Sequence, residues 1–313
     1  MNIAFLFSGQ GSQYPGMGRE LYDGFASVRE LYQTARQVLG YDLAALSFEG
    51  SAEEIAKTVV SQPLIYAVSL AALTAAREKG LNASAAAGHS LGEYAALTFC
   101  GVFDIETGFR VIDARAKAMQ QAADSAGGAM YAVIGLSAAE IAELCAQTEG
   151  YVLPVNFNSA AQTVIAGEEA AARAAADALS ARGGKVIRLN VSSAFHSRLM
   201  EPAAAELGAF LSGCTYCQPG VPFYSNLTGA RMEDFTAEKG SDLPTYLAKH
   251  LVSPVRFTDE LSAMSADGIT AYVELGPGKT LTGFVKKTVK GAAAYNIEDV
   301  GTLEKTLAAI EKA

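Results

Sequence analysis

The chain has 313 residues, a length that suits one large domain or two modest ones rather than a single small module. Its 24 Lys and Arg against 33 Asp and Glu give a formal net charge of −9, so it lacks the excess cations of a general nucleic-acid binder. Half of the residues are hydrophobic and 18% are charged, which supplies a sizeable core and argues against a disordered chain.

Cysteine usage and the N-terminus point to a cytoplasmic protein. Four cysteines are too few for a disulfide scaffold, and the single pair Cys214-x-x-Cys217 lacks the further ligands of a zinc site. The first residues have no basic start, and their apolar run is too short for a signal peptide. No stretch approaches the ~18 apolar residues needed to span a bilayer. We therefore expect a soluble chain with reduced thiols and no bound metal.

The first 126 residues alternate strand-like and helix-like patterns, as in an α/β fold. A continuous apolar run predicts a buried strand at Ile3–Phe7, followed by a glycine-rich loop. The other expected elements are helical pieces within 17–46, a helix at 63–76 that starts at its proline, a weak strand at 85–87, a helix from residue 93, and a helix from the N-cap Asp104 to residue 122.

A second unit is predicted after the pair Gly127-Gly128. Its pattern is strand, helix, strand, strand, helix, strand, the βαββαβ order of a ferredoxin-like unit. The strands are expected at 129–134, 152–156, 162–166 and 185–191, and the helices at 138–147 and 168–181. We therefore predict a small subdomain at 127–194, inserted in a body formed by 1–126 and 195–313. That body should end with a strand at 272–275 and a helix after Gly301.

Gly88-His89-Ser90-Leu91-Gly92 is a G-x-S-x-G sequence between an apolar stretch and a predicted helix. In a strand–turn–helix connection the two glycines leave room for a sharp turn that presents the Ser90 hydroxyl. The N–H of Leu91 would lie at the helix start, where free donors and the helix dipole favour an oxyanion. The alternative is a glycine-rich helix entry with a capping serine.

A nucleophilic serine needs a general base near pH 7, and the chain has three histidines. His89 adjoins Ser90, and successive side chains in a turn diverge. His196 follows the predicted insertion, where the chain returns to the main sheet, so it is the stronger candidate. A hydrogen-bonded structural histidine is the alternative. His250 precedes Ser253-Pro254 and is expected in a loop.

Four motifs occur in order along the chain: Gly9-Gln10-Gly11-Ser12-Gln13, Gly88-His89-Ser90-Leu91-Gly92-Glu93, Phe195-His196-Ser197-Arg198-Leu199-Met200 and Glu274-Leu275-Gly276-Pro277-Gly278. Together they resemble malonyl-CoA:acyl carrier protein transacylases, the acyltransferases of type II fatty acid synthesis that also occur as domains of polyketide synthases. The resemblance covers nearly the whole chain. It implies an α/β-hydrolase-like body with a ferredoxin-like insertion, in agreement with the predicted elements.

The resemblance also implies roles for individual residues. Ser90 would be the nucleophile and His196 the general base of a dyad, with the backbone N–H groups of Gln10 and Leu91 as the oxyanion hole. The family orients its histidine with a backbone carbonyl from the segment that starts at His250. Most members carry Gln at that position, but a carbonyl is available from any residue.

Three further side chains match substrate-binding positions of the family. Arg115 matches the arginine that binds the free carboxylate of malonyl, which a guanidinium can hold through two parallel hydrogen bonds. From the residues alone, a surface ion pair with Asp113 or a nearby Glu is the alternative. Gln62 matches a pocket-lining position. Phe195, before His196, accompanies malonyl rather than methylmalonyl in the family, and ordinary core packing is its alternative.

The predicted activity is ping-pong transfer of malonyl from malonyl-CoA to the phosphopantetheine thiol of acyl carrier protein, through an acyl-Ser90 intermediate and without a cofactor. We expect a monomer. Carrier proteins of this kind are acidic, so a basic patch should dock them, and two clusters qualify: Lys279, Lys286, Lys287 and Lys290, or Arg182, Lys185 and Arg188. The alternatives are an acyl hydrolase or esterase acting on thioesters, and a non-catalytic carrier-protein binding module.

Overall fold

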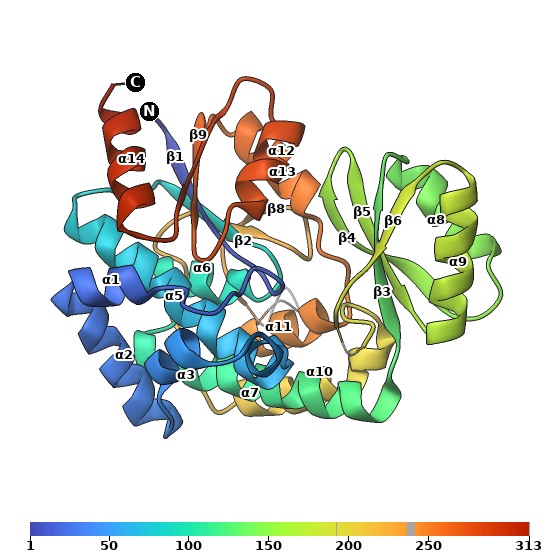
Figure 1. The fold of residues 1–313 in the computed structure, drawn as a ribbon, viewed down its shortest axis with the longest axis horizontal. Coiled ribbons are helices and arrows are strands. Elements are labelled where there is room, and N and C mark those ends of the chain that lie inside the picture. The colour runs from blue at the N-terminus through green and yellow to red at the C-terminus, as the bar shows by residue number, and fades with distance from the viewer. Residues whose placement is uncertain (192, 237–241, 313) are drawn as a thin grey trace.

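The structure is a computed structural model that describes residues 1–191, 193–236 and 242–312 (Figure 1). It contains a six-stranded sheet and a separate four-stranded antiparallel sheet, with helices packed on both. The predicted α/β fold class is therefore confirmed, and the large sheet is mainly parallel, as expected for the body.

The large sheet has the strand order β10-β9-β1-β2-β7-β8, and only β7 and β8 pair antiparallel. The strands are β1 (Ile3–Phe7), β2 (Ala85–Gly88), β7 (Phe223–Ser225), β8 (Ala230–Met232), β9 (Ala271–Leu275) and β10 (Ala293–Ile297). Phe7 lies beside Gly88 on one side and Leu275 on the other. The loops that follow β1, β2 and β9 therefore meet at one edge of the sheet, where α/β folds place their sites.

Two cores flank this sheet, because successive side chains of a strand point to opposite faces. Phe5 and Phe7 of β1 belong to a large apolar cluster, and Ala4 and Leu6 belong to a smaller one on the other face. Helices α12 (Phe257–Ala266) and α13 (Thr280–Thr288) cover the smaller cluster. The larger cluster is covered by the remaining helices of the body: α1 (Arg19–Gly24), α2 (Ala26–Leu39), α3 (Leu43–Glu49), α4 (Ala52–Ala56), α5 (Thr58–Glu78), α6 (Gly92–Phe99), α7 (Ile105–Ala126), α10 (Glu201–Leu211), α11 (Leu243–Leu251) and α14 (Val300–Glu311).

Helix α5 corrects two expectations. It starts at Thr58 rather than at Pro63, so the proline lies inside the helix. Packing of its first turns against α3 and α4 outweighs the backbone bond that proline removes. Among the described residues α5 is also the one helix long and apolar enough to cross a membrane, and 83% of its most apolar window is buried inside the molecule. The expectation that no stretch reaches this length is therefore wrong.

The second sheet has the order β4-β5-β3-β6 and is antiparallel throughout. It consists of β3 (Ala129–Ile134), β4 (Val152–Ser159), β5 (Gln162–Gly167) and β6 (Lys185–Arg188), with α8 (Ala138–Gln147) and α9 (Glu169–Ala181) packed on it. The βαββαβ prediction is confirmed. The last strand ends at Arg188, three residues early, because its pairing with β3 stops there. The subdomain boundaries themselves stay a prediction.

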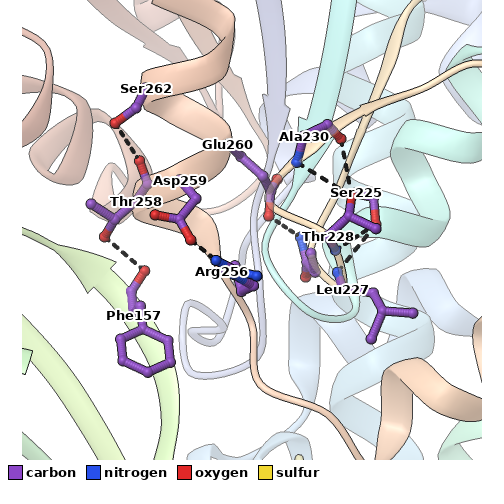
Figure 2. Close-up of polar contacts among 11 residues, drawn as sticks. Phe157, Ser225, Leu227, Thr228, Ala230, Arg256, Thr258, Asp259, Glu260 and Ser262 are labelled. Atoms are coloured by element: carbon purple, nitrogen blue, oxygen red, sulfur yellow. Dashed lines mark hydrogen bonds and ion pairs between the residues drawn. The ribbon is translucent and has the colours of Figure 1, made fainter.

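One seam joins the two sheets. The backbone of Phe157 in β4 donates to the carbonyl of Val255 (2.9 Å), and the N–H of Val255 donates to the carbonyl of Val155 (2.8 Å). The hydroxyl of Thr258 in α12 donates to the carbonyl of Phe157 (2.9 Å), as Figure 2 shows. An open groove of about 600 Å³, lined by Phe157 and Arg256 among others, lies along this seam.

The turn between β2 and α6 is pressed against β1. A Cβ atom on Gly92 would lie 2.0 Å from the carbonyl oxygen of Phe7, and one on Gly88 would lie 2.0 Å from the carbonyl carbon of Gly92. The N–H of His89 donates to the same Phe7 carbonyl (3.0 Å). Both glycines are therefore required by contact between backbones, as the G-x-S-x-G sequence predicted.

The substitution Gly92→Ala tests this contact. We expect the variant to lose about 1–3 kcal/mol of unfolding free energy in urea, since the methyl group must displace the β1 backbone. Gly283→Ala in α13 is the matched control, because a Cβ there meets open space. That control should be neutral or stabilised by about 0.5–1 kcal/mol. Equal unfolding free energies for the two variants would contradict the packing described.

Candidate active site

Ser90 lies at the tip of the turn after β2, with φ of 54°. This left-handed conformation is uncommon for a residue other than glycine, and it persists only where the surroundings hold it. The N–H of Ser90 donates to the side-chain oxygen of Asn226 (2.8 Å). The turn therefore presents the Ser90 hydroxyl, and the hydrogen bond to Asn226 holds the Ser90 backbone in place.

His196 is the partner of Ser90, and its Nε2 lies 2.7 Å from the Ser90 Oγ. The imidazole is buried, and its Nδ1 lies 3.1 Å from the carbonyl of His250 and 3.0 Å from that of Ser253. Carbonyls only accept hydrogen bonds, so Nδ1 carries the proton and Nε2 directs its lone pair at Ser90. In the described part of the chain no carboxylate contacts Nδ1. The arrangement is a dyad oriented by two backbone carbonyls.

The electrostatics of the site keep His196 neutral. Burial first and the nearby Arg115 cation second lower the pKa of His196 to about 3, although the carbonyls of His250 and Ser253 act in the opposite direction. A neutral imidazole near pH 7 can accept the proton of the serine hydroxyl.

Arg115 lies on α7 with only 1% of its surface exposed. Its Nη1 donates to the Gln62 side chain (2.6 Å), and its Nη2 donates to the Ser90 Oγ (3.2 Å). The alternative of a surface ion pair with Asp113 is wrong, since Asp113 pairs with Lys117 (2.7 Å). The guanidinium instead lies beside the Ser90 hydroxyl, with its carbon 5.1 Å from the centre of the Tyr94 ring.

The guanidinium is short of acceptors. Its Nε–H has no hydrogen-bond partner, and among the described residues no carboxylate forms an ion pair with it. Burial lowers the pKa of Arg115, with Tyr94 and Glu93 acting against it, and the group stays charged at neutral pH. A buried cation with free donors beside a nucleophile suits an anionic substrate.

Gln10 and Gln62 link the loop after β1 to α5. The Gln62 amide donates to the Gln10 side chain (3.3 Å), which in turn donates to Thr58 (3.3 Å). A Cβ on Gly9 would lie 2.6 Å from the His89 carbonyl, so this loop touches the Ser90 turn. Within residues 1–191, 193–236 and 242–312, the backbone N–H groups of Gln10 and Leu91 have no acceptor.

His250 lies in a helix rather than in the predicted loop, and Phe195 lies in the core. His250 is in α11 and fully buried, not in a loop. It shares the buried face of that helix with Leu243, Tyr246 and Leu247, and the loop begins only after Leu251. Phe195 is buried in the large core directly before His196, and its influence on the α-methyl group stays a prediction.

A cavity of about 230 Å³ lies beside the Ser90 turn, between the two sheets. Gln10, His89 and Asn158 contribute to its lining. His89 points away from the nucleophile and its Nε2 lies 2.7 Å from the Asn158 side-chain oxygen. This contact ties the Ser90 turn to β4. No group of three metal-ligating side chains is found in the part of the chain that the structure describes.

Sequence reasoning missed Asn226, Glu93 and Glu260, which lie under the turn. A lone asparagine after a short strand carries no motif, and Glu93 and Glu260 appear in helices where most glutamates are exposed. Only the three-dimensional contacts reveal them.

Comparison with known proteins places the chain in a family. Residues 4–312 match the acyl transferase domain family. The chain is 40% identical over 310 residues to the malonyl CoA-acyl carrier protein transacylase of Escherichia coli K12, covering 97% of this chain and 98% of that one. It is 36% identical over 314 residues to the protein of the same name from Bacillus subtilis 168, covering 99% and 98%.

Solved structures agree. The malonyl CoA-acyl carrier protein transacylase of Clostridium perfringens superposes with a TM-score of 0.93 at 34% identity, over 100% of this chain and 98% of that one. A malonyl-transacylase solved in complex with a type II polyketide synthase acyl-carrier protein gives a TM-score of 0.93 at 38% identity, over 99% of this chain and 100% of that one. Since the match extends over nearly the whole chain and both sheets, the protein belongs to the acyl transferase domain family and is an acyltransferase.

Proposed function

We propose that this acyltransferase moves a malonyl group from malonyl-CoA to the phosphopantetheine thiol of acyl carrier protein. The names of its relatives support this substrate and acceptor. The single observation that carries the proposal is the Arg115 guanidinium within 3.2 Å of the Ser90 Oγ. A malonyl thioester offers both an electrophilic carbonyl for the serine and a free carboxylate for the cation.

The proposed mechanism has two half-reactions. The Ser90 Oγ attacks the thioester carbonyl, and His196 Nε2 takes the hydroxyl proton. The N–H groups of Gln10 and Leu91 hold the oxyanion of the tetrahedral intermediate. The carbon–sulfur bond then breaks, and the CoA thiolate leaves with the proton from His196. The carrier-protein thiol attacks the acyl-serine by the same steps in reverse.

Arg115 would select the acyl group. Without substrate, buried N–H donors of the guanidinium lack partners. The malonyl carboxylate would accept two charge-assisted hydrogen bonds from them. Acetyl has no such carboxylate and leaves the cation uncompensated, which penalises its transfer. The neighbouring Gln62 accepts from Nη1 of the guanidinium, while Nη2 donates to the serine hydroxyl.

Of the two basic clusters, the lysines of α13 and its flanks fit carrier docking better. Lys279, Lys286, Lys287 and Lys290 are exposed, and no ion pair among the described residues involves them. In the other cluster Arg188 is already paired with Glu169 (2.6 Å). Leu281 and Phe284 of α13 line the cavity beside the Ser90 turn, so one helix carries both part of the cavity lining and two of the lysines. The proposal also includes a monomer, a cytoplasmic location and no cofactor, since a thioester is already activated.

Incubation with radiolabelled malonyl-CoA tests the reaction. We expect label on the protein that Ser90→Ala abolishes, and transfer of that label to added carrier protein. Release of free malonate faster than transfer would instead support a thioester hydrolase. An unlabelled wild-type protein would support a non-catalytic binding module.

Substitution of Arg115 tests substrate selection. Arg115→Gln should lower kcat/KM for malonyl-CoA on the order of 10²–10⁴-fold, since two hydrogen bonds to a charged group are lost, and leave acetyl-CoA unaffected or improved. Arg110→Gln, on the exposed face of the same helix, is the matched control. An unchanged preference for malonyl over acetyl would discard the carboxylate clamp.

The same variant gives a second readout, in the pH dependence of Ser90 reactivity. The neutral form of His196 acts as the base, so reactivity falls as pH drops through its pKa. Removal of the Arg115 cation raises the pKa of His196. We therefore measure the rate at which a fluorophosphonate labels Ser90 as the pH is lowered. The rate for Arg115→Gln should begin to fall at a higher pH than the rate for the wild type. Identical pH dependences for the two proteins would rule out this electrostatic coupling.

Charge reversal tests the docking surface. Lys286→Glu with Lys287→Glu should raise KM for carrier protein about tenfold or more and leave KM for malonyl-CoA unchanged, because charges at the rim of an interface govern encounter. Arg182→Glu with Lys185→Glu serves as the comparison. Equal effects on both substrates, or a larger effect in the comparison variant, would discard the α13 surface.

A further inference from the structure

The side-chain amide of Asn226 uses its full hydrogen-bonding capacity under the Ser90 turn. The residue follows β7 and is completely buried. Its Oδ1 accepts from the Ser90 N–H (2.8 Å) and faces the His250 Nε2 (3.2 Å). Its Nδ2 donates to the Gly88 carbonyl (2.6 Å) and to Glu260 Oε1 (2.8 Å). An amide offers two donors and two acceptor lone pairs, so none is left over.

This amide spans the turn. Its oxygen accepts from the Ser90 N–H and its nitrogen donates to the Gly88 carbonyl, as the backbone of a neighbouring strand would. The two backbone partners also fix which end of the amide is oxygen, because Ser90 N–H can only donate and the Gly88 carbonyl can only accept. The clamp acts where φ of Ser90 is 54°, a strained conformation that persists only where the surroundings hold it.

His250 connects this clamp to the base. Because Asn226 Oδ1 carries no hydrogen, the His250 Nε2 must carry one and donate it. Its Nδ1 is buried without a partner, which fits an unprotonated nitrogen. The backbone carbonyl of the same residue accepts from His196 Nδ1 (3.1 Å). His250 thus contacts Asn226 through its side chain and His196 through its backbone carbonyl.

A second layer holds Asn226 in place. Its backbone N–H donates to Glu93 Oε2 (2.8 Å), and Glu93 Oε1 accepts from the hydroxyl of Tyr246 (2.7 Å). Figure 2 shows Glu260 reaching from α12 toward the loop that follows β7. Helices α6, α11 and α12 therefore all contribute to the position of one amide.

We propose that Asn226 is a positioning residue that fixes the backbone of Ser90 for attack, and that the His250 side chain couples this support to His196. The inference rests on the proposed role of Ser90 as nucleophile. Neither side chain touches the reacting atoms. Both act by keeping the Ser90 Oγ and His196 Nε2 at 2.7 Å in the productive orientation.

The test is the second-order rate constant for labelling of Ser90 by a fluorophosphonate, together with the labelled fraction at completion. In Asn226→Ala we expect the rate constant to fall on the order of 10²-fold while nearly all folded protein is eventually labelled, because the nucleophile is misplaced rather than lost. Thr228→Ala is the matched control. It lies in the same loop, its hydroxyl bonds to the backbone of Ala230 at the start of β8, and it should label like the wild type.

A pair of variants at His250 separates positioning from folding. His250→Gln keeps a side-chain N–H for Asn226 and the backbone carbonyl, so its rate constant should stay within about threefold of the wild type. His250→Leu loses the donor and should label about tenfold more slowly. KM for malonyl-CoA should be unchanged in both, because Arg115 is untouched.

Two outcomes overturn the inference. One is Asn226→Ala protein that labels at the wild-type rate but to a smaller fraction, which indicates loss of folded protein only. The other is equal rates for His250→Gln and His250→Leu. The probe carries no malonyl group, so wild-type labelling without malonyl transfer would reject the proposed function and leave the positioning role standing.

Discussion

A buried guanidinium next to the Ser90 hydroxyl is the constraint on which the rest of the site depends. Burying a cation is costly unless other groups compensate it, and Arg115 has one amide, one hydroxyl and an aromatic face instead of a carboxylate. This buried cation lies with its Nη2 3.2 Å from the Ser90 Oγ. In the proposed function the substrate carboxylate supplies the missing charge, so that binding energy is recovered where the acyl carbonyl must react.

The same cation acts on the base. Arg115 contributes to lowering the pKa of His196, which keeps the imidazole unprotonated before substrate arrives. A carboxylate bound to the guanidinium would reduce that influence and make the imidazolium formed during attack easier to sustain. Arg115 thus links compensation of its own charge to proton transfer by His196. An acyl group without a carboxylate would neither compensate the guanidinium nor stabilise the imidazolium.

Sequence reasoning succeeded where local rules decide the structure. The glycines at 88 and 92 are forced by backbone contact, so the G-x-S-x-G sequence predicted the Ser90 turn. Periodicity predicted the βαββαβ unit with its helix at Ala138–Gln147. Sequence alone failed where long-range packing decides. From the residues alone, Arg115 is better explained by a surface ion pair, His250 is expected in a loop and Pro63 at a helix start, and the structure contradicts all three. Asn226 gave no signal, because its four partners come from three distant segments.

The most direct test of the central claim is a crystal structure of the acyl-enzyme, formed by soaking malonyl-CoA into crystals of the wild-type protein in the absence of carrier protein. The account predicts an ester at the Ser90 Oγ whose free carboxylate lies within hydrogen-bond distance of two Arg115 nitrogens, with the guanidinium still held by Gln62. An acyl group whose carboxylate points into solvent, away from Arg115, would contradict it.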